Sequence, residues 1–327
     1  MTITIIIPVY NRASVVPTTL YTVMAQTHRP LQVVLVDNDS TDNTLQVIQD
    51  FKQDHECDNF MVDVVTEGHH TAGAARNSGF AKATGEWIMF FDSDDLMDCE
   101  LVARYVQQIE LAQKKRGALL DLISARSKLV FPDGSNRQAP FHKHDLFANH
   151  ILHGQLATQR YAVRREFFAA TDGWNINLPG WNDWEMGLRL LLANPRVAYL
   201  TGRPRILINH NGADSITGTE FHSRQGQWEH VIDIMKNEVR CSMLKTKHKR
   251  RFERLLEYRR IVLAAQYQRE GFPELAKPLC HQAYQALQQT YNGSRRWRWL
   301  VAPMTRRLFA RIAAGKRGSA RIARLLY

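Results

Sequence analysis

Two carboxylates stand two residues apart at the point where a hydrophobic run ends. Residues 86–91 have the composition of a buried strand. They are followed directly by Asp92, Ser93, Asp94 and Asp95. Carboxylates are hard oxygen ligands that suit Mg²⁺ or Mn²⁺, with diphosphate oxygens or waters completing the shell. The alternative is that this run caps a helix starting near residue 96, because Asp and Ser are favoured at helix N-termini. Three acids in four positions exceed what a cap needs.

A second acid follows an earlier apolar run. Residues 32–36 are rich in β-branched side chains, and Asp37 comes directly after them. A carboxylate there could accept hydrogen bonds from the base or ribose of a nucleotide, whereas for Asp39 and Asp42 we favour helix capping.

Short apolar runs alternate with helical patterns through the first third of the chain. Strands are expected at 3–9, 32–36, 61–66 and 86–91, and helices at 14–26, after 40 and at 72–83. This alternation predicts a parallel sheet. Ligands of such sheets bind beyond the carboxyl ends of the strands, which is where residues 10–12, 37–39 and 92–94 fall.

The later chain divides into two further regions. Residues 119 to about 210 combine expected strands at 119–131, 160–164 and 196–200 with the turn-rich segment 171–182. From about residue 220 the apolar spacing is helical, with breaks at Pro273 and at 292–294.

Four segments carry a resemblance to a known family. Residues 5–12, 36–42, 74–79 and 85–95 resemble, in order and spacing, the signatures of family 2 glycosyltransferases with the GT-A fold. The resemblance covers roughly residues 1–215. It implies an α/β, GT-A-like domain with a mostly parallel sheet flanked by helices, in which residues 1–118 bind the nucleotide and 119–215 the acceptor. Residues 216–327 would form a helical, basic C-terminal extension.

The resemblance also assigns roles to donor-site residues. Pro8, Tyr10 and Asp37 would surround the nucleoside, Asp92 would face the ribose, and Asp94 would hold a metal ion that bridges the diphosphate. The same motifs place Arg12, Ser93 and Arg76 at the nucleotide sugar, Arg76 near the phosphates. The alternative for Arg76 is a salt bridge at a strand end.

The acceptor side is expected in residues 179–189. Asp183 matches the family's catalytic acid, although Asn182 replaces the Glu that normally precedes it. In an inverting transfer such a carboxylate deprotonates the attacking hydroxyl. The alternative for Asp183 is capping of the helix that runs to residue 192. Glu185 is the fallback base and acceptor contact. Trp181 and Trp184 would stack on an acceptor sugar or belong to the core.

One histidine is a candidate second metal ligand. Residues 206–216 resemble the late family segment in which a His completes the metal shell, which here is His210. An imidazole suits Mn²⁺ better than Mg²⁺. The alternative is a polar residue that binds no ligand.

Charge divides the chain unevenly. Residues 1–240 hold 23 Lys and Arg against 28 Asp and Glu, and the remainder holds 20 against 4. The tail, 295–327, shows helical apolar spacing with Trp297 and Trp299 at its start, which predicts binding to an anionic membrane surface. The alternative is that its apolar stripe packs on the enzyme itself. Nucleic-acid binding has no motif to support it.

The cysteines and the apolar stretches indicate where in the cell the protein is expected. The four cysteines are scattered, so neither a disulfide framework nor a zinc site is expected. No apolar stretch approaches a membrane span, which predicts a cytoplasmic protein, peripheral on the inner face of the membrane.

These features together predict an enzyme and leave two alternative functions. The prediction is a metal-dependent inverting glycosyltransferase, using Mn²⁺ or Mg²⁺, that moves a sugar from a nucleotide sugar, UDP-sugars favoured, to a hydroxyl of a glycan or lipid-linked acceptor in surface-polysaccharide biosynthesis. A nucleotidyltransferase would need a glycine-rich basic loop after the first strand, which residues 8–12 do not form. A non-enzymatic scaffold that binds membranes or nucleic acid would bind no nucleotide.

Overall fold

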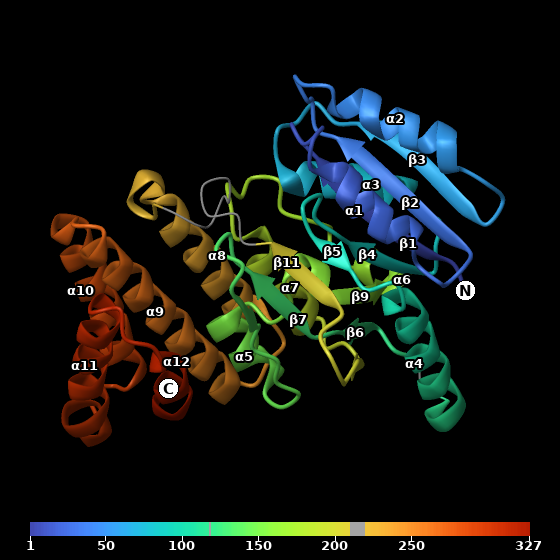
Figure 1. Ribbon diagram of the computed structural model, residues 1–327. Coiled ribbons are helices and arrows are strands. Elements are labelled where there is room, and N and C mark those ends of the chain that lie inside the picture. The colour runs from blue at the N-terminus through green and yellow to red at the C-terminus, as the bar shows by residue number, and fades with distance from the viewer. Residues whose placement is uncertain (118, 210–219) are drawn as a thin grey trace.

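The computed structural model describes residues 1–117, 119–209 and 220–327 (Figure 1). Its main sheet has seven strands in the order β10-β6-β9-β4-β1-β2-β3. They are β1 Ile3–Val9, β2 Leu31–Asp37, β3 Phe60–Thr66, β4 Trp87–Phe90, β6 Leu122–Ser124, β9 Tyr161–Arg164 and β10 Val197–Tyr199. All neighbouring pairs are parallel except the two that β9 makes with β4 and β6. The expected mostly parallel α/β sheet is therefore confirmed.

Helices cover both faces of this sheet, because successive side chains of a strand point to opposite sides. On β1, Ile5 and Ile7 pack with residues of α1 Val16–Met24, α2 Thr44–His55 and α4 Leu101–Arg116. Ile6 faces the other way and packs with residues of α3 Ala72–Lys82, α6 Arg165–Ala169 and α7 Asn182–Leu192. The central strands β1, β2 and β4 are therefore buried on both sides, which explains their mostly apolar sequence.

A smaller sheet lies beside the first. It has the order β5-β11-β7-β8 and consists of β5 Leu96–Met97, β7 Ser127–Val130, β8 Asn136–Gln138 and β11 Ile206–Asn209. Two expectations are corrected here. The single strand expected over 119–131 is split between the two sheets as β6 and β7. The helix expected near residue 96 begins only at Leu101, because β5 pairs with β11 first.

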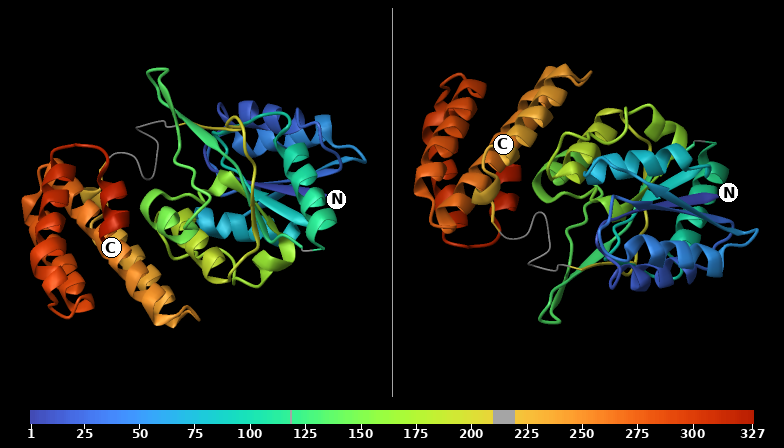
Figure 2. Two further views of the ribbon diagram at one scale, coloured as in Figure 1. Left: turned by 90° about the horizontal axis from the view of Figure 1, so that it is seen from below. Right: turned by 90° about the horizontal axis from the view of Figure 1, so that it is seen from above.

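The C-terminal helices form one body beside the sheets, as both views of Figure 2 show. They are α8 Gln227–Cys241, α9 Thr246–Arg269, α10 Pro273–Thr290, α11 Ala302–Ala313 and α12 Ser319–Leu326. Their hydrophobic core is continuous with α7 and with α5 Leu146–His153, through residues such as Ile151 and Trp184. The domain boundary expected at residue 215 lies outside the described residues.

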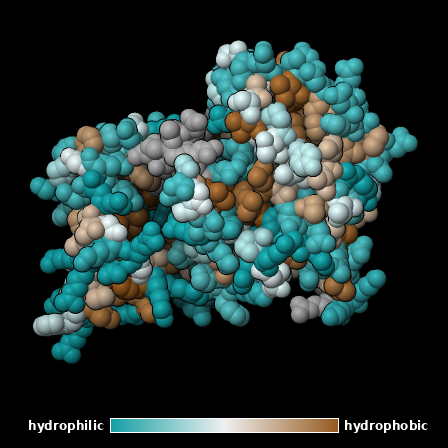
Figure 3. Space-filling view, viewed as in Figure 1, coloured by the Kyte–Doolittle hydropathy of each residue, from teal (hydrophilic) through white to brown (hydrophobic). Residues whose placement is uncertain are grey.

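The tail differs from a free membrane-binding helix. Trp297 and Val301, in a π-helical turn, and Leu308 and Ile312 on α11 are buried in the core that α9 and α10 share. The apolar stripe therefore packs on the protein itself, as the alternative interpretation held, because the helices around it offer a matching apolar surface. On the face drawn in Figure 3 the C-terminal helices, at the left, are mostly hydrophilic outside. Within the described part of the chain, no helix is long and apolar enough to cross a membrane.

Candidate active site

The carboxyl ends of β1 and β2 meet at one edge of the sheet. Val9 pairs with Asp37, and Pro8 one residue earlier pairs with Val36. Asp37 is almost fully buried, and its Oδ2 accepts the backbone N–H of Ser40 at 3.2 Å. Its Oδ1 is also buried and has no hydrogen-bond partner among the residues that the structure describes. Because burying an unpaired polar atom costs free energy, Oδ1 is suited to accept a hydrogen bond from a ligand.

The loop after β1 carries Tyr10 and Arg12 and is joined to the loop after β2. Asn11 adopts a left-handed backbone, with φ of 49°, and its N–H donates to Ser40 Oγ at 3.1 Å. The N–H of Arg12 donates to Thr44 Oγ1 at 2.8 Å. The side chain of Tyr10 is half exposed at this edge. The two loops therefore hold an accessible aromatic ring and a buried carboxylate near each other.

Arg76 on α3 binds the acid that follows β4. Its Nη2 lies 2.7 Å from Asp92 Oδ1, and its guanidinium lies over the ring of Trp174, 4.6 Å from the centroid. The other oxygen of Asp92 accepts a hydrogen bond from Gln159 Nε2 at 2.5 Å. The side chain of Asp92 is still 30% exposed. The salt bridge expected as the alternative for Arg76 is therefore present, at the same edge as Asp37.

The three residues after Asp92 lie in different environments. Ser93 is buried, and its carbonyl accepts the hydroxyl of Thr19 at 2.9 Å. Asp94 is partly exposed, and its backbone carbonyl accepts the side-chain amide of Asn209. Asp95 is 1% exposed, and burial, with the nearby charges of Asp92 and Asp94, raises the pKa of its carboxyl well above the usual range.

Asp95 does not cap a helix, which corrects the alternative interpretation of the acid run as a helix cap. Its Oδ1 accepts the backbone N–H of Asn209 at 2.8 Å, and its Oδ2 accepts a hydrogen bond from Gln159. Asp95 thus links the end of β4 to β11 and, through Gln159, to Asp92. Asp92 and Asp94 are therefore the two acids of the run whose side chains are partly open to solvent.

Asp183 lies in the first turn of α7 and in the same electrostatic environment. Its Oδ1 accepts the N–H of Trp184 at 2.9 Å. Burial raises the pKa of the Asp183 carboxyl; the charge of Arg76 lowers it and that of Asp92 raises it. A raised pKa makes a carboxylate a better proton acceptor. The fold therefore brings Asp183 to Arg76 and Asp92 from about ninety residues further along the chain.

The other three residues expected at the acceptor are buried or partly buried. Trp184 is buried, and its indole N–H donates to the carbonyl of His150 at 3.1 Å. Glu185 is 1% exposed, and its two oxygens accept hydrogen bonds from Arg189 at 2.5 and 3.0 Å. Trp181 is partly buried and packs against Trp184, with the ring centroids 5.2 Å apart. This packing favours a core role for Trp184 and an ion-pair role for Glu185.

Of the two expected metal ligands, Asp94 lies within the described residues. His210 lies outside the described residues. Among those that are described, no group of three or more His, Cys, Asp or Glu side chains could hold a metal ion. The side chain of Asp94 still fits a divalent cation, because Mg²⁺ and Mn²⁺ sites commonly take one or two carboxylates and complete their shell with waters and substrate phosphates.

Sequence reasoning missed three residues that shape the site. Gln159 and Asn209 hold the acid run as described above. Asn77 exchanges two hydrogen bonds with the backbone of Trp174, at 2.8 and 2.9 Å. A Cβ on Gly173 would stand 2.7 Å from Asn77 Oδ1, and φ there is 68°, so this turn needs a glycine. Asn77 was detectable as the neighbour of Arg76; Gln159 and Asn209 have no sequence signal that we recognise.

Comparison with known proteins decides the family. Residues 4–117 match the model of glycosyl transferase family 2. This part of the chain is a family 2 glycosyltransferase domain. The matched residues contain Asp37, Arg76 and the whole acid run, so the match includes this edge of the sheet.

Individual relatives extend the comparison. An uncharacterised glycosyltransferase of Nostoc sp. is 31% identical over 193 residues, which are 57% of this chain and 58% of that protein. The poly(ribitol-phosphate) β-glucosyltransferase of Bacillus spizizenii is 35% identical over 107 residues, 32% of this chain and 17% of that enzyme. The chain therefore spans little more than half of the first relative and a small part of the second.

A solved structure matches nearly the whole family 2 glycosyltransferase domain and the helices after it. TarS 1-349 of S. aureus in complex with UDP-GlcNAc aligns with a TM-score of 0.71 at 18% identity, over 99% of this chain and 91% of that one. The expected GT-A-like fold followed by C-terminal helices is thus confirmed.

Proposed function

We propose that this protein is a glycosyltransferase that moves a sugar from a nucleotide sugar to a hydroxyl of a glycan or lipid-linked acceptor. The observation that carries the proposal is the clustering of Asp37, Asp92 and Asp94 at one sheet edge within a family 2 domain. UDP-sugars are the favoured donors, which the UDP-GlcNAc complex of the TarS structure supports.

The donor would lie across the carboxyl ends of β1, β2 and β4. Asp37 Oδ1, which is buried and unpaired among the described residues, would accept a hydrogen bond from the nucleoside, beside Pro8 and Tyr10. Asp92 would face the ribose. Arg76 would add positive charge close to the diphosphate, and Arg12 and Ser93 are proposed to contact the nucleotide sugar.

A divalent cation, Mn²⁺ or Mg²⁺, would be held by Asp94, with His210 as the proposed second ligand. When bound, such an ion stabilises the negative charge that develops on the leaving diphosphate. The chain's own contribution is to present Asp94 while Asp92 is held by Arg76 and Gln159.

Asp183 is the proposed general base. The acceptor hydroxyl would give its proton to Asp183 while its oxygen bonds to the anomeric carbon, and the bond from that carbon to the diphosphate oxygen would break on the opposite face, which inverts the configuration. Burial around Asp183 supports this role, because it raises the pKa of the carboxyl and so its basicity. Trp181, partly exposed beside this helix, is the better placed of the two tryptophans to contact an acceptor sugar.

The place of the reaction is proposed as surface-polysaccharide biosynthesis on the inner face of the cytoplasmic membrane. The name of the Bacillus relative supports a polyol-phosphate polymer as one candidate acceptor. The apolar stripe of the tail is buried against the protein and is not available to a membrane. Membrane contact would therefore be made by Trp299 and Leu300, which are 81% and 50% exposed and follow Arg298.

A donor screen tests the proposed function. Purified protein is incubated with Mn²⁺, a panel of nucleotide sugars and acceptors that include poly(ribitol phosphate), and the products are resolved by mass spectrometry. We expect release of a nucleoside diphosphate, with Asp94→Ala abolishing metal-dependent donor binding. Pyrophosphate chemistry with a nucleoside triphosphate would establish the rival nucleotidyltransferase, and absence of any nucleotide binding would favour the non-enzymatic scaffold.

A further inference from the structure

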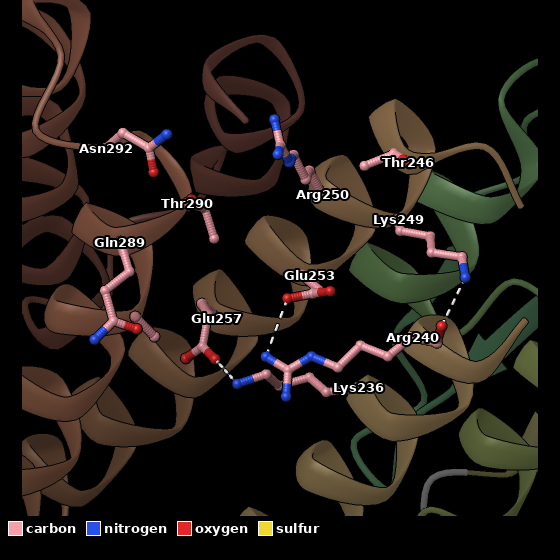
Figure 4. Close-up of a pocket in the computed structure, with 11 residues that line it drawn as sticks. Lys236, Arg240, Thr246, Lys249, Arg250, Glu253, Glu257, Gln289, Thr290 and Asn292 are labelled. Atoms are coloured by element: carbon pink, nitrogen blue, oxygen red, sulfur yellow. Dashed lines mark hydrogen bonds and ion pairs between the residues drawn. The ribbon is translucent and has the colours of Figure 1, made fainter.

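A polar cavity of about 390 Å³ lies between three C-terminal helices (Figure 4). It is separate from the donor edge, since α8, α9 and α10 form it. Its charged lining residues are Lys236, Arg240, Lys249, Arg250, Glu253 and Glu257. Thr246, Gln289 and Asn292 add hydroxyl and amide groups, and Ala286 is the one apolar lining residue among those described. The volume suits a ligand the size of one or two sugar units, and the lining suits a polar one.

The two acids of the cavity are already neutralised. Glu253 Oε2 lies 3.1 Å from Arg240 Nη2, and Glu257 Oε1 contacts Lys236 Nζ, as the dashed lines of Figure 4 show. The second oxygen of Glu257 lies 3.5 Å from Arg260 Nε. Both carboxylates therefore have cationic partners, and the positive charge of the other cavity side chains is uncompensated.

Lys249 and Arg250 supply that surplus charge. Neither makes an ion pair among the residues that the structure describes. Lys249 Nζ donates one hydrogen bond, at 2.6 Å, to the carbonyl of Arg240, which leaves two ammonium N–H groups. Arg250 is exposed with its guanidinium available. The two side chains leave the helix in different directions, so an anion in the cavity would meet positive charge from two sides.

The start of α9 adds to the attraction for an anion. The helix begins at Thr246, and no acidic residue and no side-chain cap lie at its first turn. The free N–H groups of a helix start carry partial positive charge, which disfavours the lysines there and favours a bound anion. The helix start and the surplus side-chain charge therefore coincide at this cavity.

We propose that this cavity binds a phosphate-bearing unit of the acceptor, at a distance from the hydroxyl that receives the sugar. The inference rests on the proposed function, because it assigns the ligand to the acceptor chain. A recessed polar cavity with one apolar side chain fits a phosphorylated sugar or polyol better than a bilayer surface, which binds through exposed apolar residues backed by basic ones. A long anionic acceptor would thus be held at two places, and the remote phosphate would raise its affinity.

Charge-matched variants test the cavity. Lys249→Gln/Arg250→Gln removes two charges from its lining, and Lys245→Gln/Lys247→Gln removes two exposed charges from the same helix start outside it. Binding of inorganic tripolyphosphate is measured by calorimetry at fixed ionic strength in metal-free buffer, where the metal-dependent donor site is silent. We expect the first pair to weaken binding at least about tenfold, as loss of charge-assisted contacts does, and the second pair to weaken it less than about twofold.

Three further measurements separate the outcomes. The KM for poly(ribitol phosphate) should rise in the first pair, while UDP binding with Mn²⁺ stays unchanged. Equal loss in both pairs would overturn the site in favour of diffuse charge. Loss of binding to phosphatidylglycerol vesicles without loss of tripolyphosphate binding would overturn it in favour of a membrane surface. If wild-type protein bound tripolyphosphate at the cavity but no nucleotide, the proposed function would fail while the anion site stood.

Discussion

At the scale of residues, one ion pair organises the candidate site. Arg76 and Asp92 neutralise each other across 2.7 Å, and both charges act on Asp183. Asp92 therefore has two effects: it presents an oxygen at the proposed donor site and it opposes ionisation of the proposed base. The sequence predicted these three residues separately, but their proximity depends on how α3, β4 and α7 pack.

The pH dependence of turnover tests that coupling. If Asp183 is the base, as proposed, turnover requires its ionised form, so the rate should fall as pH drops through the pKa of its carboxyl, which is raised. Asp92 contributes to the rise; Asp92→Asn should therefore move the acid limb of kcat to lower pH at saturating donor. Asp58→Asn, an exposed change elsewhere, should leave the profile in place. An acid limb at the same pH in both variants would show that Asp92 does not raise the pKa of the catalytic base.

At the scale of elements, α5 and α7 fix the acceptor side through a buried histidine. His150 accepts the N–H of Leu156 at Nδ1, at 3.1 Å, and its Nε2 lies 2.7 Å from the carbonyl of Trp184. This arrangement requires a neutral ring that donates from Nε2. A Cβ on Gly187 would stand 2.4 Å from the His150 ring, so α7 can approach α5 only with glycine there.

Protonation of His150 should therefore destabilise the fold. Burial lowers the pKa of His150 from 6.5 to about 4. As pH falls below 6.5 the unfolded state takes up the proton first, so the stabilisation is complete above pH 6.5 and is lost toward pH 4. Between pH 7 and 5 this histidine should cost about 2 kcal/mol of the free energy of unfolding.

Urea unfolding at the two pH values checks this figure. His150→Gln should be less stable at pH 7 but lose about 2 kcal/mol less than the wild type on going to pH 5. An equal loss in both proteins would mean that other groups, such as His153, carry the pH dependence.

The elements show what sequence patterns can and cannot predict. Strands β1 to β4 and helices α1 to α3 lie close to their predicted positions, because burial leaves a mostly apolar signal in these strands, strongest in the central β1, β2 and β4. No glycine or proline interrupts residues 119–131, so the sequence predicts one strand there, yet the segment contributes strands to two sheets. Gln159 lies just before β9 and Asn209 ends β11. Both contact the acid run only because these strands fold back beside it, so no local sequence pattern marks them.

At the scale of the whole molecule, charge and packing gave different indications for the C-terminal part. The excess of 20 basic over 4 acidic residues after residue 240 predicted an anionic partner, and the apolar spacing of the tail predicted a membrane. The apolar spacing is satisfied internally by α9 and α10, whereas the charge remains on the surface and in the cavity beside α9. Hydrophobic periodicity predicts a buried face but not which surface buries it.

The same core joins the helices to the acceptor side. Trp184, two positions from the start of α7, packs with residues of α8 and α9. The first turn of α7, which carries Asp183, is therefore supported by the C-terminal helices as well as by the main sheet. The central claim of a nucleotide-sugar site with a separate base thus concerns the whole chain.

Asp183→Asn tests that claim most directly. Donor binding is measured by calorimetry with UDP and Mn²⁺, and turnover is measured with the donor and acceptor that the screen identifies. We predict that donor affinity stays within about twofold of the wild type while turnover falls at least about a hundredfold, because the amide cannot accept the acceptor's proton. Unchanged turnover would contradict the account.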